Sequence, residues 1–336
     1  MTDDANFLLV RRRACQLLGM AAVGAVTAPE AWAAPVSIRI VADKGVENHT
    51  MIGLMNSQGY LAACGVRQNL VMVDKPAATL HALLDDQADL CVTSAFNGLL
   101  PAIAKGAPVK IVGAAMQKLA LAVYSGRLNI TSVADLAGCT LGIGPEFGLL
   151  HVAALALMRA KGIDPAKVQF VNLDSNLDVY RHVKAGTLDA GISDVADMAG
   201  TKSSGPHILS DGRLWQTLPD YPYQLAYVSA RAISDNRDGI VRALAAYGRL
   251  FRFVSSPGSG SAYAAARAAV GGNRQSAAAM WHFIQTTQPY TGSPGIPTKR
   301  IFYLQGLDVS VGLQPAVLPL DAVADLSLAH DAMAMI

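Results

Sequence analysis

Two stretches of the chain carry the same pattern at an offset of 100 residues. In the first, the strand-like segment Val71–Asp74 is followed by a helix-like run and then by Asp89–Ser94. In the second, Val171–Asp174 is followed by a helix-like run and then by Asp189–Asp194. Each stretch is typical of a strand–helix–strand unit. Two such units in one chain predict two lobes, with a cleft for a small ligand between them.

The first 34 residues have the pattern of an export signal. Three arginines at positions 11–13 precede a low-polarity stretch over residues 17–28, and Ala31–Ala33 follows as a small-residue cleavage site. The low-polarity stretch is too short for a membrane span. We therefore expect a cleaved signal peptide over residues 1–34, exported by the general secretion or the twin-arginine route, and a periplasmic protein of about 300 residues, enough for two domains.

The composition suits a folded chain with a large core. Hydrophobic residues make up 52% of the sequence and charged residues 15%, which argues against disorder. The net charge of +2 and the lack of a basic run after residue 34 give no sign of nucleic-acid binding. After signal removal Cys64, Cys91 and Cys139 remain, an odd number. We expect Cys91 to be a buried thiol, and a Cys64–Cys139 bridge stays open.

Strand-like and helix-like segments alternate as far as residue 230, which predicts an α/β fold with mainly parallel sheets. From Asp235 onward the pattern is almost wholly helical, with breaks at Pro257-Gly258, Gly271-Gly272 and Gly292–Pro297. The strands are expected at Ile38–Ala42, Leu70–Val73, Leu90–Thr93, Val109–Ala114, Leu119–Tyr124, Thr140–Ile143, 168–173, 189–193 and 223–230. The helices are expected at His49–Cys64, Ala77–Asp86, Ala95–Lys105, 133–138, Gly148–Lys161 and Leu177–Ala185.

Several of these segments resemble one known family. Ser132–Gly148 resembles the second-lobe entry of type II periplasmic binding proteins, and Ala153–Gly162 with Asp164-Pro165 continues the match. Ala185–Ala190 and its counterpart Asp86–Ser94 resemble a further segment of the family. The group in question contains receptors for nitrate, sulfonates, taurine and thiamine-pyrimidine precursors, together with related pyrimidine synthases. The resemblance covers roughly residues 36–250.

The resemblance implies a fold and a division of the chain. The fold would be two Rossmann-like α/β lobes joined by two crossover strands, with the ligand cleft between them. One lobe would comprise residues 35–122 and 228–336, and the other residues 123–227. Closure of the lobes would trap the ligand, with the free energy supplied by contacts to both lobes.

Ligands of open α/β sheets bind beyond the carboxyl ends of the strands, and this rule selects the candidate site residues. Asp174 could equally be a turn or cap residue, and Thr93 and Ser94 could cap the helix that follows. Glu146 and Asp194 could be surface charges, and Phe147 could belong to the core. The candidates are Asp43, Glu47, Thr93, Ser94, Asn97, Glu146, Phe147, Asp174 and Asp194, with Tyr124 as an aromatic face near the hinge.

No cofactor and no metal are expected. His49 and His151 take matching positions in the two halves, but they lack clustered partners at ligand spacing. The glycines at 142, 144 and 148 are spaced one residue too widely for a dinucleotide loop. We interpret this turn as a helix N-terminus that offers N–H groups to ligand oxygen atoms.

The charges of the candidate loops favour one ligand class. The loops carry several carboxylates, whereas Lys44 is their one obvious basic residue. An anion receptor usually contains arginine or several other donors. The sequence therefore favours a nitrogen heterocycle or an amine over a sulfonate, while an aromatic carboxylate or sulfonate stays open.

These features predict a monomeric periplasmic receptor that delivers a small molecule to the permease of an ABC importer and performs no catalysis. Two alternatives stay open. One is an enzyme like the family's pyrimidine synthases, although no Gly-x-Ser-x-Gly nucleophile motif occurs. The other is a ligand-sensing periplasmic module coupled to a signalling receptor.

Overall fold

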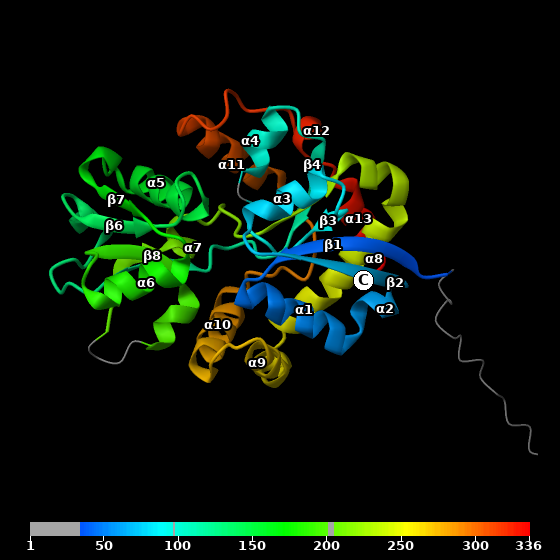
Figure 1. Cartoon of the computed structure of the whole chain (residues 1–336), viewed down its shortest axis with the longest axis horizontal. Helices are drawn as coiled ribbons and strands as arrows, with labels where there is room; N and C mark the ends of the chain where they lie inside the picture. Colours follow the sequence, from blue (N-terminus) through cyan, green and yellow to red (C-terminus); the bar gives the residue numbers. More distant parts are fainter. Residues whose placement is uncertain (1–33, 97, 201–204) are drawn as a thin grey trace, which may run out of the picture. The chain divides into compact units, whose positions relative to one another are not determined.

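The computed structural model describes residues 34–96, 98–200 and 205–336, and within these ranges the strands form two five-stranded sheets (Figure 1). The expected signal peptide lies outside the described residues, except for Ala34. The first sheet has the order β2 (Val66–Val73), β1 (Val36–Asp43), β3 (Leu90–Cys91), β10 (Leu225–Ser229), β4 (Val109–Ala114). The second has the order β7 (Gln169–Asn172), β6 (Thr140–Ile143), β8 (Ala190–Asp194), β5 (Leu121–Ser125), β9 (His207–Arg213).

The two sheets have the same arrangement, as the repeat in the sequence predicts. In each, the strand second from one edge runs against the others: β10 pairs antiparallel with β3 and β4, and β5 pairs antiparallel with β8 and β9. The remaining pairs are parallel. The sheets are therefore mixed. In each sheet four strands run in one direction, as the prediction of mainly parallel sheets requires, and the fifth is reversed.

The reversed strands carry the chain from one sheet to the other. β5 follows β4 along the chain but belongs to the second sheet, and β10 follows β9 but belongs to the first. The two connecting segments lie side by side, because the N–H groups of Tyr223 and Gln224 both donate to the Met116 carbonyl, at 2.8 and 3.0 Å. The expected lobe boundaries at 122/123 and 227/228 fall inside these two strands, and the division into lobes stays a prediction.

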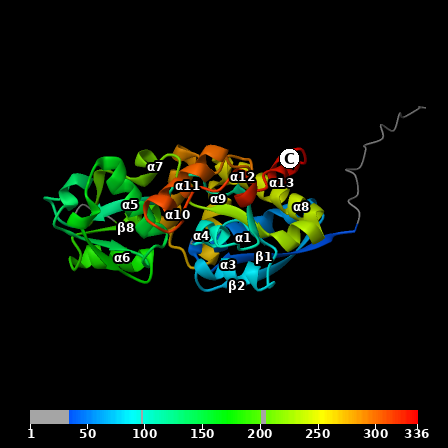
Figure 2. The same cartoon turned by 90° about the horizontal axis from the view of Figure 1, so that it is seen from above.

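Helices cover both faces of each sheet (Figures 1 and 2). Four 3-10 turns are present in the described ranges: η1 (Val133–Leu136), η2 (Pro165–Lys167), η3 (Val195–Gly200) and η4 (Pro257–Ser259). The α-helices are α1 (Val46–Gln58), α2 (Tyr60–Ala63), α3 (Ala77–Leu84), α4 (Leu99–Ala104), α5 (Leu149–Lys161), α6 (Asn176–Ala185), α7 (Leu214–Thr217), α8 (Ala230–Ser255), α9 (Gly260–Ala269), α10 (Arg274–Thr287), α11 (Thr298–Ser310), α12 (Leu320–Val323) and α13 (Ser327–Met333).

Differences from the expected elements have local causes. The expected helix His49–Cys64 starts earlier, at Val46, and is divided at Gly59, which has a left-handed backbone (φ 67°). The helix expected from Ala95 begins only at Leu99, because Gly98 precedes it with φ 72°. Strand β9 is not among the expected elements, because it is an edge strand with only two buried residues and its pattern lacks an apolar run.

Alternation along the first sheet divides its core between two faces. Ile40 and Leu90 pack against residues of α1 and α8, whereas Val41 and Cys91 pack against residues of α3 and α4. Cys91 is fully buried, as expected. The possible Cys64–Cys139 bridge is absent, since all three described cysteines are free. Among the described residues, no helix has both the length and the apolar character that a membrane crossing requires.

Hydrophobic packing also joins the two halves along one side. Val195 and Ala196 of η3, which follows β8 of the second sheet, belong to the same buried cluster as Phe283 of α10. The ring of Trp215, which precedes β10, meets Phe283 edge to face at 5.2 Å. Figure 1 draws α10, which carries Phe283, at the lower side of the boundary between the two sheets.

Helix α6 approaches the second sheet closely because two glycines face it. Gly142 of β6 and Gly191 of β8 are register partners. A Cβ atom at Gly191 would lie 2.4 Å from Cγ1 of Val179, and one at Gly142 would lie 3.0 Å from the same atom. Only glycine therefore allows α6 to take this position.

Gly191→Ala should accordingly destabilise the protein. Because the added methyl group has no space beneath Val179, we expect the free energy of unfolding to fall by about 1–3 kcal/mol, measured by urea denaturation. The control is Gly258→Ala, since a Cβ at Gly258 meets no atom within 4 Å. Equal stability of the two variants would contradict the close packing of α6.

Candidate functional site

The loop after β1 is anchored by hydrogen bonds within the first sheet. One carboxylate oxygen of Asp43 accepts from the N–H of Gly45 at 2.8 Å and the other from the Asn48 side chain at 2.6 Å. The Asp43 N–H donates to Ser94 Oγ, which follows β3, at 3.0 Å. Asp43 thus holds the turn into α1, and both of its oxygens already have partners.

Gln224, at the end of the second connecting segment, reaches into the same loops. Its Nε2 donates to the carbonyl oxygen of Thr93 and, at 3.3 Å, to Oδ1 of Asn48. Its Oε1 is buried and has no hydrogen-bond partner in the part of the chain that the structure describes. A buried amide oxygen without a donor is costly, so this atom is an available acceptor beside the loops after β1 and β3.

Glu47 lies in a buried cluster built from distant parts of the chain. Arg267 of α9 donates from Nη1 to Glu47 Oε2 at 2.6 Å, and the Tyr263 hydroxyl donates to the same oxygen at 2.5 Å. The Tyr290 hydroxyl approaches the other oxygen at 3.4 Å. The side chains of Glu47 and Arg267 are only 13% and 5% exposed, so this ion pair is largely shielded from water.

Asp194, at the end of β8, is an acid of the second sheet at the position that Ser94 takes in the first repeat. Its carboxylate accepts from Asn176 Nδ2 at 3.0 Å and from the Tyr223 hydroxyl at 2.9 Å. The next turn adds Asp197, which accepts from Ser193 Oγ at 2.6 Å. Tyr223 belongs to the connecting segment, and its hydrogen bond therefore ties the hinge to the second sheet.

These acids and Arg267 influence one another across the boundary between the sheets. Burial raises the pKa of Glu47, Arg267 opposes this shift, and the charge of Asp194 adds to it. Burial also raises the pKa of Asp194. It raises that of Asp197 to about 6, with Asp194 as the next cause. Arg267 is paired with Glu47 and acts on Asp194 and Asp197 through its charge alone. Among the described residues, its Nε has no hydrogen-bond partner.

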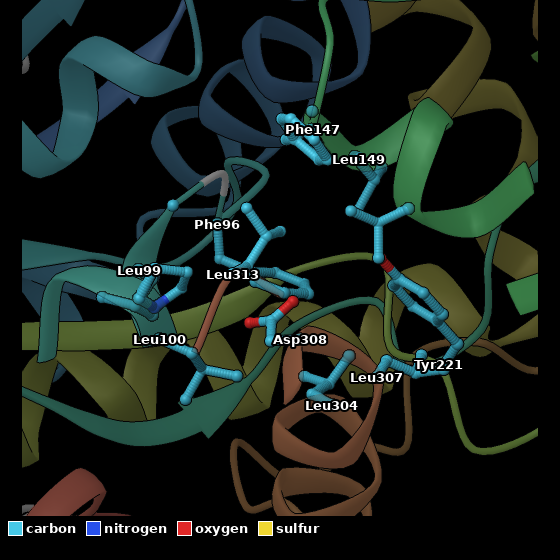
Figure 3. A pocket seen from close by; sticks show the side chains of 14 residues that line it. Phe96, Leu99, Leu100, Phe147, Leu149, Tyr221, Leu304, Leu307, Asp308 and Leu313 are labelled. Atoms are coloured by element: carbon cyan, nitrogen blue, oxygen red, sulfur yellow. The ribbon is translucent and has the colours of Figure 1, made fainter. Parts of the chain in front are cut away.

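A second part of the boundary is apolar (Figure 3). Phe96 and residues of α4 and α11 form one wall, and Phe147 and the start of α5 form the other. Tyr221, in the connecting segment, packs against Phe96 with ring centroids 6.5 Å apart. The cavity between the walls has a volume of about 30 Å³, room for one or two water molecules.

Phe147 is held in an unusual conformation at the edge of this cavity. Its φ of 56° lies in the left-handed region, which is rare for a bulky residue. Its N–H donates to Nδ1 of His151 at 3.0 Å. Burial lowers the pKa of His151, against the opposing charge of Glu146, and the neutral ring can accept this hydrogen bond. His151 therefore fixes the turn that presents Phe147.

The structure brings only some of the expected site residues together. Asp43 and Ser94 contact each other through the hydrogen bond described above, and Thr93 contributes its carbonyl next to them. Glu47 and Asp194 are close enough for the charge of Asp194 to raise the pKa of Glu47. Phe147 lines the apolar cavity.

The other candidates lie elsewhere. Glu146 and Asp174 are exposed. Tyr124 is fully buried, with its ring edge-on to Tyr180 at 5.4 Å, so it presents no aromatic face to a ligand in this arrangement. Asn97 lies outside the described residues. Lys44, expected as the basic residue of the loops, pairs at the surface with Asp74 at 2.6 Å.

Sequence reasoning missed the residues that reach the cleft from far along the chain. Arg267 stands 220 positions after its partner Glu47, in a helical region without a recognisable motif. Gln224 lies at the start of the expected strand 223–230, where no motif signals a contact with the loops after β1 and β3. A hydrophobic pattern reports which face of an element is buried but not which distant element covers it.

Without Arg267, the buried carboxylate of Glu47 should destabilise the folded protein. We expect Arg267→Met to lower the free energy of unfolding by about 3–5 kcal/mol at pH 8, because Glu47 then carries an unpaired buried charge. The loss should be smaller at pH 5, since a raised pKa allows Glu47 to be protonated there. Denaturant titrations at both pH values test this. The double variant Glu47→Gln with Arg267→Met should recover most of the loss, and a pH-independent loss would contradict the assignment.

Comparisons with known proteins agree with this architecture. The structure of the periplasmic aliphatic sulphonate-binding protein SsuA from Escherichia coli matches with a TM-score of 0.70 at 17% identity, over 87% of this chain and 92% of that one. The periplasmic nitrate-binding protein NrtA from Synechocystis PCC 6803 matches with a TM-score of 0.68 at 11% identity, over 90% and 89%. The desulfurization enzyme DSZB matches with a TM-score of 0.58 at 15% identity, over 89% and 99%.

The fold is therefore the two-lobed type II periplasmic binding protein fold, and the prediction from the sequence is confirmed. No curated protein sequence matches the chain. Residues 46–254, more than half of the chain, match the family model described as NMT1/THI5 like. The chain belongs to the NMT1/THI5-like family.

Proposed function

We propose that the protein is a periplasmic solute receptor, which binds a small organic molecule between its lobes and delivers it to an ABC importer. The observation that carries the proposal is the buried cluster in which Glu47 and Arg267 of the first lobe face Asp194 of the second. A solute that contacts both lobes can favour their closed arrangement, because closure then adds contacts. The structural likeness to SsuA and NrtA, both periplasmic binding proteins, supports the same function.

The charges favour a nitrogen heterocycle or an amine as the ligand. Within the described ranges, the cluster holds the acids Glu47, Asp194 and Asp197 around the single cation Arg267. Burial has raised the pKa of each of these acids, so an N–H donor or a positive charge beside them offsets part of the cost of desolvation. The unpartnered Oε1 of Gln224 adds another acceptor. A sulfonate would add to the negative charge of this cluster.

We propose binding without catalysis, although DSZB has the same fold and is an enzyme. The described cysteines offer no activated nucleophile: burial raises the pKa of Cys91 to about 11 and also raises that of Cys64. A nucleophilic cysteine requires the opposite shift. The acids of the cluster are engaged with hydroxyl and amide donors, which suits hydrogen bonding to a solute.

A thermal-shift screen tests the receptor proposal and its ligand class. The purified protein is heated with pyrimidines, primary amines, alkanesulfonates, nitrate and aromatic acids. A ligand that binds the folded state alone stabilises it by about 2.7 kcal/mol at 100 times its Kd. We expect pyrimidines or amines to raise the melting temperature. A shift with sulfonates instead would contradict the charge argument, and no shift with any class would contradict the receptor.

Asp194→Asn should weaken the binding of a responding pyrimidine or amine by at least about tenfold, because a hydrogen bond to a charged group contributes about 1.5–3 kcal/mol. For an amine that stays protonated, affinity should rise from pH 5 to pH 7, since Asp197, with a pKa of about 6, becomes charged over this range. Titration calorimetry measures both effects. Asp85→Asn changes an exposed carboxylate and serves as the control. Unchanged affinity in Asp194→Asn would remove this residue from the site.

A further inference from the structure

We infer that the apolar cavity between the lobes is a second subsite of the same cleft, which takes a protonated amine on an apolar skeleton with Asp308 as its counter-ion. The inference rests on the proposed receptor function and adds to it. The subsite differs from the Glu47–Arg267–Asp194 cluster in its residues and in its character. It would select a solute that carries both a ring or alkyl body and a basic nitrogen.

The cavity combines one carboxylate with an otherwise apolar lining. Figure 3 shows the Asp308 carboxylate at its centre, with Leu99 and Leu100 on one side and Tyr221 on the other. Asp308 and Tyr221 are the two titratable residues among those that line it. The α4 and α5 walls contribute only glycine, proline and hydrocarbon or phenyl side chains.

The carboxylate has no compensating partner. Within the described ranges, no basic side chain pairs with Asp308 and no donor bonds to its carboxylate, and burial raises its pKa to about 7. Tyr221 nearby stays a neutral phenol, because burial and the charge of Asp308 raise its pKa, so it supplies no counter-charge. Tyr303, whose ring lies 6.2 Å from that of Tyr221, is the next titratable group on α11.

Asp308 is partly exposed, but the apolar lining withholds part of the water from its carboxylate, so ionisation there is less well solvated than in the unfolded chain and destabilises the folded protein. The raised pKa means that folding holds a proton on Asp308 and that stability is lost as the pH rises through about 7. A purely structural position would be better filled by leucine. A perturbed acid in a cleft is instead typical of a functional group.

The cavity walls belong to different lobes, which explains how a solute could occupy so narrow a space. Phe147 and Leu149 come from the second lobe, whereas Leu304 and Asp308 come from the first. The present volume of about 30 Å³ is far below the few hundred Å³ of a typical ligand site. The solute therefore enters with the lobes apart. Phenyl rings on both sides then cover its apolar part and favour its positive charge.

The test uses benzylamine and phenethylamine, with benzyl alcohol as the uncharged counterpart. In titration calorimetry we expect the amines to bind at least tenfold more tightly than the alcohol. Asp308→Asn should weaken amine binding at least tenfold and leave alcohol binding unchanged. Asp321→Asn, on the exposed start of α12, is the matched control and should bind the amines as the parent protein does.

Proton release on amine binding distinguishes a ligand-binding Asp308 from a structural one. At pH 6.5 the binding of a protonated amine should release a proton from Asp308. The measured enthalpy should then vary between two buffers of different ionisation enthalpy, and this variation should vanish in Asp308→Asn. The melting temperature of that variant at pH 8 should equal or exceed that of the parent protein. A lower value would show that Asp308 is structural and would overturn the inference.

The outcomes separate this inference from the receptor function. If Asp194→Asn abolishes amine binding while Asp308→Asn retains it, the amine sits in the Asp194 cluster. The subsite is then overturned and the receptor stands. If none of the three compounds binds, the subsite is likewise overturned, whereas the pyrimidines of the thermal-shift screen decide separately on the receptor.

Discussion

Each sheet receives its one reversed strand from the other half of the chain, and the site depends on this exchange. β5 and β10 can take their places only if the two connecting segments run next to each other, as their hydrogen bonds to Met116 show. The carboxyl ends of the parallel strands then meet at one boundary. From the second segment Tyr223 reaches Asp194 and Gln224 reaches Thr93, so a single stretch of chain contacts both halves of the cleft.

The sequence was informative wherever the signal is local. Strand Val109–Ala114 has the predicted limits, and the helix before Gly162 ends at the predicted glycine, which has a φ of 69°. The repeat at 100 residues also anticipated two equivalent sheets. The insertion of a reversed strand and the return of Arg267 to Glu47 are long-range pairings, which single-sequence patterns do not encode. The site was therefore predictable as a set of loops but not as a charge cluster.

In the proposed receptor, the acids of the cleft would link protons, solute and lobe position. Bringing the lobes together removes carboxylates from water, which favours their protonated forms. A solute with N–H donors offsets the same desolvation without a proton. Protons and solute are thus alternative ways to accommodate closure, and by linkage each reduces the affinity of the closed lobes for the other. Arg267 limits the effect by neutralising Glu47 within the first lobe.

The ring contact between Trp215 and Phe283 gives the cleft a closed side. Since η3 and α10 share a hydrophobic cluster there, the lobes cannot part along that edge without exposing core residues. On the other side, at the top of Figure 1, α4, α11 and α5 also share a buried cluster, but the cavity beside Phe147 leaves that contact incompletely packed. If the proposed receptor opens on this side, a solute would enter and leave past Phe147. A partner that releases the solute would have to separate the lobes along this edge.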